Sequence, residues 1–205
     1  MAHCLLSVLI IAGAAWQPDG AKADPSPPDY RIVFRYRADG PTSVKDYESE
    51  VTVYERQKDG TEKRIGTFTG SIFPDDLKTR GRVKDGRYDL YLGLHRRSKD
   101  GKALTPSKED LVVKSQGWLR PALIVNADAA VPVESLNPAK KTSTYIHVHN
   151  GFRERRSSEG CLTLAPDDWS RFIAPFLERY PDLADWHTEG RYYGRKVAVL
   201  QVERR

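Results

Sequence analysis

The sequence has 205 residues, of which 39% are hydrophobic, 30% charged and 10% aromatic, and its formal net charge is +5. This length and composition predict one globular domain and exclude a disordered or collagen-like chain. No apolar run approaches the roughly 20 residues that a membrane-spanning helix needs, so we expect no integral membrane segment. Two cysteines are too few for a disulfide-stapled miniprotein or a four-thiolate zinc site.

The amino terminus has the pattern of an export signal. A short apolar stretch, Leu5–Trp16, precedes the small-x-small triplet Ala21–Ala23, which is typical of a signal-peptidase site. We therefore predict that residues 1–23 are cleaved, although the segment lacks the usual Lys or Arg at its start. A buried amino-terminal segment is the alternative. Residues 24–29 are a Pro-rich lead-in, and residues 30–205 are predicted to form a single domain.

Cleavage would leave Cys161 as the only cysteine of the mature chain, because Cys4 lies in the removed segment. A single cysteine cannot form an intramolecular disulfide, so it is an inert buried thiol, an intermolecular link or a nucleophile. The positive net charge favours anionic surroundings. For an exported protein in the periplasm or cell envelope, wall polymer or anionic lipid fits this charge better than nucleic acid.

The elements in chain order indicate a mostly β protein. Runs rich in apolar and alternating residues predict strands, and the turn at Lys58–Thr61 predicts a hairpin between two of them. The predicted strands are Arg31–Arg37, Tyr47–Glu55, Arg64–Phe73, Arg87–Leu94, Ala122–Val125, Thr144–His149 and Lys196–Val202.

One helix is predicted to begin at Pro166 and to end before Pro181. Its apolar residues recur at helical spacing, which is typical of a helix with one face in the core. Pro175 lies inside this pattern, so we expect a kink or a weak point there. The apolar stripe consists of Trp169, Phe172, Ile173, Phe176, Leu177 and Tyr180.

The strand before the cysteine carries two histidines. Side chains alternate across a strand, so His147 and His149 share one face, while Ile146 and Val148 point to the other. The loop that follows is long enough to bring Cys161 beside them. An imidazole can then activate the thiol, whose ordinary pKa is about 8.5.

The glycine before the cysteine also fits nucleophilic chemistry. Gly160 permits an unusual turn in which the backbone N–H groups of Gly160 and Cys161 face a developing oxyanion. Ser158 is suited to hydrogen bonding within the same turn.

These segments resemble the L,D-transpeptidases, the YkuD-type catalytic domain family. Ile146–His149 matches the apolar-x-apolar-His strand end, and Ser158–Leu162 matches the nucleophile turn. Val83–Leu90 is similar to the family's Gly-x-Tyr/Phe strand. The turn departs from the family at Glu159, where many members have histidine, and at Thr163, where many have Arg or Asn.

The resemblance implies a β-sandwich or barrel with one main helix after the cysteine, and peptidoglycan stem peptides as partners. It implies that Cys161 forms an acyl-enzyme with His149 as base and His147 as the close alternative. It also implies roles in cell wall biogenesis and cell shape, L,D-transpeptidase or L,D-carboxypeptidase activity, no cofactor, and acylation by carbapenems.

Three alternatives remain open at this stage. His147, His149 and Cys161 could instead bind zinc in a hydrolase, or the domain could bind the cell wall without turnover. The loop arginines could grip a substrate carboxylate, since a guanidinium matches its geometry, or could simply be solvated. The loop residues named for substrate binding are Asn150, Arg153, Arg155 and Arg156.

Overall fold

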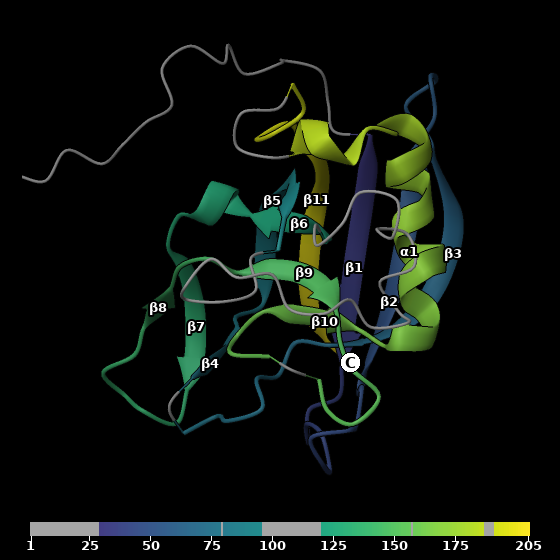
Figure 1. Cartoon of the computed structure of the whole chain (residues 1–205). Coiled ribbons are helices and arrows are strands. Elements are labelled where there is room, and N and C mark those ends of the chain that lie inside the picture. Colours follow the sequence, from purple (N-terminus) through teal and green to yellow (C-terminus); the bar gives the residue numbers. More distant parts are fainter. Residues whose placement is uncertain (1–28, 79, 96–119, 157, 187–190) are drawn as a thin grey trace, which may run out of the picture.

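The computed structural model describes residues 29–78, 80–95, 120–156, 158–186 and 191–205. The predicted signal peptide and all but the last residue of the Pro-rich lead-in lie outside these residues. Within them the protein is mostly β, with a closed barrel, a small second sheet and one main helix (Figure 1). This confirms the predicted fold class. Among the described residues, none of the helices has the length and hydropathy needed to cross a membrane.

Eight strands close the barrel in the order β1-β11-β5-β6-β9-β10-β3-β2 within the part of the chain that the structure describes. Their bounds are β1 (Tyr30–Tyr36), β2 (Ser49–Arg56), β3 (Glu62–Ser71), β5 (Gly86–Leu94), β6 (Pro121–Val125), β9 (His147–Asn150), β10 (Leu162–Leu164) and β11 (Lys196–Arg204).

Two of the strand pairings in the barrel are parallel, and the first joins segments that are far apart in the sequence. The first strand pairs with the last, from Tyr30 opposite Ala198 to Tyr36 opposite Arg204. The second parallel pair is β9 with β10, in which Leu162 lies opposite Val148. The second pairing brings the strand after the cysteine alongside the strand that carries the two histidines.

The second sheet lies on the opposite side of the molecule from the main helix (Figure 1). It contains β4 (Gly81–Val83), β7 (Val131–Ser135) and β8 (Thr142–Ser143). The sequence did not predict these strands, because two to five residues are too few to establish a period-2 pattern.

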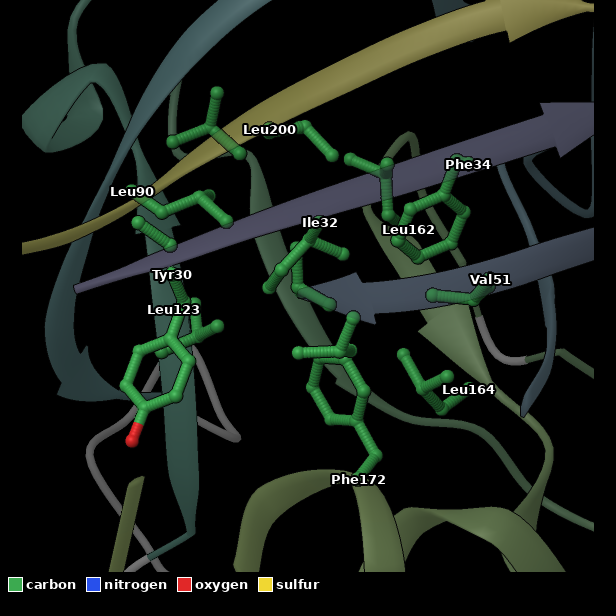
Figure 2. Packing of buried hydrophobic residues seen from close by; sticks show 14 of the residues in the cluster. Tyr30, Ile32, Phe34, Val51, Leu90, Leu123, Leu162, Leu164, Phe172 and Leu200 are labelled. Carbon is green, nitrogen blue, oxygen red and sulfur yellow. The ribbon is translucent and has the colours of Figure 1, made fainter. Parts of the chain in front are cut away.

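The helix α1 (Pro166–Arg179) packs against β3 and directs its apolar face into the core. Trp169, Phe172, Ile173 and Phe176 are buried, as predicted. Figure 2 shows Phe172 pointing from the helix into the cluster of strand side chains that fills the barrel. Two short 3-10 helices, η2 (Asn126–Asp128) and η3 (Leu183–Trp186), complete the structure.

Most predicted strands are present, with changes at their ends. The hairpin turn is confirmed, because Gln57 N–H donates to Thr61 O and Gly60 has a φ of +83°. The predicted strand at residues 144–149 is shifted to His147–Asn150. It begins later because Tyr145 has a φ of +57°, which no β-strand residue adopts.

Candidate active site

Cys161 lies directly before β10, and strand register determines which way its side chain faces. Leu162 and Val148 are opposite each other and fully buried in the core. Because side chains alternate along a strand, their neighbours Cys161 and His147 face the outer side of the barrel. Thr163 lies opposite His149 on that same side. The two histidines therefore share a face, as the alternation predicted, and Cys161 lies on the same face.

Backbone groups at the start of β9 hold the thiol. His147 N–H donates to Cys161 Sγ at 3.5 Å, and the thiol donates to Tyr145 O at 3.7 Å. The left-handed backbone of Tyr145 is uncommon for an aromatic residue. Its side chain is 70% exposed. This turn therefore places a carbonyl at the sulfur and leaves the ring of Tyr145 exposed to solvent.

The environment of Cys161 disfavours the thiolate. Burial is the main cause that raises the pKa of Cys161 to about 11, and the carboxylates of Glu159 and Asp128 raise it further. The N–H of His147 opposes this shift. A thiol with this pKa is protonated near neutral pH. The structure therefore favours a neutral thiol over a resting thiolate–imidazolium pair, so a base must take the proton during attack.

Both ring nitrogens of His147 have partners. Nε2 lies 2.9 Å from Asp128 Oδ1, and Nδ1 lies 3.1 Å from Nδ1 of His95. The ring is buried, with 8% of the residue exposed. Asp128 ends η2, and His95 directly follows β5. The side chain of His147 thus connects β9 to two other parts of the barrel.

The ring of His149 is oriented by the backbone carbonyl of the next residue, Asn150. Its Nδ1 lies 2.8 Å from Asn150 O, which is an acceptor, so Nδ1 carries the hydrogen. This tautomer leaves the basic lone pair on Nε2. The ring of His95 stacks on that of His149, with 3.9 Å between centroids and 19° between planes. His149 itself is 3% exposed, so its ring is held on two sides.

His95 and Asp128 were missed by the sequence analysis. His95 lies 52 residues before His147, and Asp128 lies 19 residues before it. No motif spacing connects them, because they meet only through the pairing of β5 with β6 and of β6 with β9. The one sequence signal is that each follows a strand, at the strand ends where functional side chains often lie.

The nucleophile turn has the expected glycine conformation. Gly160 has a φ of +127°, which side chains rarely adopt. Its N–H donates to Ser158 Oγ at 3.1 Å, and Ser158 Oγ donates to Cys161 O at 2.6 Å. The N–H of Gly160 therefore already donates within the turn. Of the two N–H groups expected to face an oxyanion, this leaves the N–H of Cys161 as the candidate donor. Exposed Glu159 forms an ion pair with Arg80 at 3.1 Å.

The loop residues expected to bind substrate fall into two groups. Arg156 is 2% exposed, and its guanidinium donates to the carbonyls of Ser43, Asp46 and Pro74. Arg156 therefore connects three segments of the chain inside the protein. The expectation that it contacts substrate is wrong, because its guanidinium is buried and bonded to these carbonyls. Asn150 is also buried, with its carbonyl facing His149. The other two, Arg153 and Arg155, are exposed, and Arg153 pairs with Asp167 at 2.6 Å.

The zinc alternative required His147, His149 and Cys161 to converge on one ion. Among the residues that the structure describes, no group of three or more His, Cys, Asp or Glu side chains is arranged to hold a metal ion. The nitrogens of His147 instead face Asp128 and His95. The described residues therefore do not provide the ligand set that this alternative needs.

No family model matches the sequence, and no curated protein matches it. Among solved structures, the chain is similar to a mutant of the helical cell shape determining protein Pgp2 from Campylobacter jejuni. That match has a TM-score of 0.40 and 14% identity, and covers 86% of this chain and 48% of that one.

A second structure of Pgp2 from Campylobacter jejuni gives a TM-score of 0.37 and 15% identity, over 86% of this chain and 49% of that chain. The chain thus spans about half the length of the protein that it matches. We therefore base the function on the chemistry of the site.

Proposed function

We propose that this protein is a cysteine-dependent acyl-transferase that acts on a peptide carbonyl through an acyl-enzyme at Cys161. The observation that carries the proposal is the shared face of Cys161 and His149, with His149 Nδ1 directed at Asn150 O. A nucleophile, a histidine and an acceptor that orients the histidine make up the arrangement needed for covalent catalysis.

His149 is the proposed base, in preference to His147. Asp128 and His95 occupy both nitrogens of the His147 ring. A proton from Cys161 could reach His147 only by breaking one of these bonds. Because His149 Nδ1 donates to Asn150 O, the basic lone pair of its ring is on Nε2, and the resemblance also favours this histidine as the base.

The reaction would proceed in two transfers. Cys161 Sγ bonds to the peptide carbonyl carbon while its proton passes to His149 Nε2, and Cys161 N–H stabilises the oxyanion. The C–N bond then breaks, and the leaving amine takes the proton from His149. A second amine attacks the thioester to give a crosslink, or water attacks to give hydrolysis, and the thiol is regenerated.

The substrate class comes from the resemblance to L,D-transpeptidases. We propose peptidoglycan stem peptides as substrates, in the periplasm or cell envelope, with the role in cell wall biogenesis that this chemistry implies. The exposed loop side chains of Arg153 and Arg155 are suited to a peptide carboxylate. Cleavage of residues 1–23 and a single catalytic domain over residues 30–205 are part of the same proposal.

Intact-mass spectrometry with a carbapenem tests the proposal directly. We expect the mature protein to gain one drug equivalent, because the β-lactam carbonyl takes the place of the peptide carbonyl. The gain should be absent in Cys161→Ala and unchanged by a chelator. Wild-type protein that gains no mass with the carbapenem, and that releases no product from purified peptidoglycan fragments, would contradict the proposal.

A second candidate function follows from the raised pKa of Cys161. A thiol held neutral suits a cell-wall-binding module that does not turn over its ligand. Such a module would bind peptidoglycan equally well as wild type and as Cys161→Ala, with no carbapenem adduct. Co-sedimentation with insoluble peptidoglycan measures this binding in both proteins.

A further inference from the structure

Asp128, His147 and His95 form a connected group that the proposed acyl transfer does not use. Asp128 Oδ1 lies 2.9 Å from His147 Nε2, and the Nδ1 atoms of His147 and His95 are 3.1 Å apart. The group ends where the ring of His95 stacks on His149. Its members come from η2, from β9 and from the residue after β5.

The acceptors in this group determine where the hydrogens lie. An ionised Asp128 can only accept, so His147 Nε2 carries a hydrogen. In a neutral His147 ring the other nitrogen, Nδ1, is then the acceptor. His95 must therefore donate its own Nδ1 hydrogen. The carboxylate of Asp128 thus fixes the tautomer of His147, and His147 in turn fixes the tautomer of His95. The same hydrogen bonds hold the ring of His95 against that of His149.

The backbone that presents Asp128 is strained. Asn126, Ala127 and Asp128 have φ values of +49°, +51° and +64°. A left-handed conformation costs about 1–2 kcal/mol for most residues with a side chain, but Asn and Asp adopt it more readily, so the strain lies mainly at Ala127. Such strain persists only where surrounding contacts impose it, and it is frequent at functional sites. Here Asn126 Oδ1 accepts from Asp89 N–H at 3.0 Å, and Asp128 reaches His147.

We propose that His95 is a positioning residue for the base His149, held in place by the Asp128–His147 pair. The flat face of His95 restricts the ring of His149 about its side-chain torsions, while Asn150 O sets its tautomer. The Nε2 lone pair is thereby kept in one direction for proton transfer from Cys161. Misplacing a reacting group by about 1 Å can cost roughly 100-fold in rate, so a side chain that never touches substrate can control the reaction.

This inference rests on the proposed function, and its test separates the two. Three substitutions of His95 separate the effect of its stacking on His149 from the effect of its hydrogen bond to His147. His95→Ala removes both the stack and the hydrogen bond. In His95→Phe the stack is kept without the hydrogen bond, whereas His95→Asn keeps a polar atom near the position of Nδ1 without the stack. His95 is half-buried at a strand end, so each variant should fold.

We expect His95→Ala to lower the rate constant of carbapenem acylation by about 10- to 100-fold. The concentration of drug for half-maximal rate should stay unchanged, because His95 does not touch the drug. His95→Phe should recover part of the rate, because it keeps the stack but lacks the hydrogen bond that holds the ring, whereas His95→Asn should not recover it. The inference is overturned if His95→Ala acylates within about twofold of wild type, or if His95→Phe is no faster than His95→Ala.

A spectroscopic measurement tests the inference without requiring activity. Long-range proton–nitrogen NMR spectra report which nitrogen of each histidine carries the hydrogen. We expect the Nε2–H tautomer for His147 and the Nδ1–H tautomer for His95 and His149. Asp128→Asn should mix the tautomers of His147, and His95→Ala should broaden the signals of His149.

The two measurements give distinguishable failures. Wild-type protein that is not acylated but shows these tautomers, with His149 signals that depend on His95, contradicts the proposed function alone. Wild-type protein that is acylated, with His149 signals that do not respond to His95→Ala, contradicts the positioning role alone.

Discussion

Among single residues, Cys161 has a reactivity that depends first on the burial of its thiol and then on the charges around its sulfur. Burial and two carboxylates raise its pKa to about 11, against an ordinary thiol value near 8.5. The thiolate is the form that reacts with alkylating agents. The rate of alkylation by iodoacetamide should therefore keep rising with pH until about 11. A small-molecule thiol would reach its plateau roughly two pH units lower.

The carboxylate of Glu159 should lower the reactivity of the Cys161 thiol. This carboxylate raises the pKa of Cys161, so Glu159→Gln should lower that pKa and speed alkylation at mildly alkaline pH. Because the Glu159 side chain is 81% exposed, salt screens its effect, and we expect a gain of about two- to threefold that disappears near 1 M salt. Glu154→Gln, a change at an exposed loop carboxylate that pairs with Lys45, is the matched control. A rate equal to wild type at low salt would contradict this expectation.

At the level of elements, α1 contains a proline in its interior. Pro175 was expected to kink or weaken the helix, which extends through this residue from Pro166 to Arg179. A proline at this position cannot donate the hydrogen bond to the carbonyl four residues earlier. The buried face of the helix, including Phe172 and Phe176, compensates for that loss. The carbonyl of Pro175 also accepts from Tyr30 OH at 3.4 Å.

Replacing this proline should stabilise the protein. Pro175→Ala restores the missing N–H donor, and a helix-interior proline costs up to about 3 kcal/mol relative to alanine. We expect the free energy of unfolding to rise by about 1–2 kcal/mol, measured by urea denaturation. Ala174→Gly, at the neighbouring half-buried position, should lower it by about 1 kcal/mol. A loss of stability in Pro175→Ala would show that the helix requires the proline's fixed geometry.

At the scale of the whole molecule, Arg156 ties the nucleophile loop to the barrel connections. Its guanidinium donates to Ser43 O at 2.6 Å, Asp46 O at 3.0 Å and Pro74 O at 3.2 Å. The buried charge also lies 3.9 Å from Asp75. The loop that carries Cys161 therefore depends on segments more than 80 residues away in the sequence.

Removing this guanidinium should affect stability and reactivity together. Arg156→Met leaves three carbonyls without their donor, and an unsatisfied buried polar group costs about 1–3 kcal/mol. We expect a loss of about 2–4 kcal/mol in urea denaturation, with slower carbapenem acylation because the loop is no longer fixed. The adjacent Arg155→Met is the control, since Arg155 is exposed. Equal stability of the two variants would contradict the structural role of Arg156.

Features that repeat within one element were predictable from the amino-acid sequence. Alternation along residues 144–149 predicted that His147 and His149 share a face, and helical spacing predicted the buried side of α1. The glycine at position 160 indicated an unusual turn, which its φ of +127° confirms. These properties are local, because the backbone geometry of a strand, helix or turn sets the direction of each side chain within a few residues.

The sequence does not reveal which distant groups meet at the site, because these contacts form only when the barrel folds. The pairing of β5 with β6 and of β6 with β9 brings His95 and Asp128 to His147. The folding of three loops around one guanidinium makes Arg156 a structural residue. The physical reason is that strand register and loop packing are set by contacts between segments. Such contacts leave no periodic trace in the residues that make them.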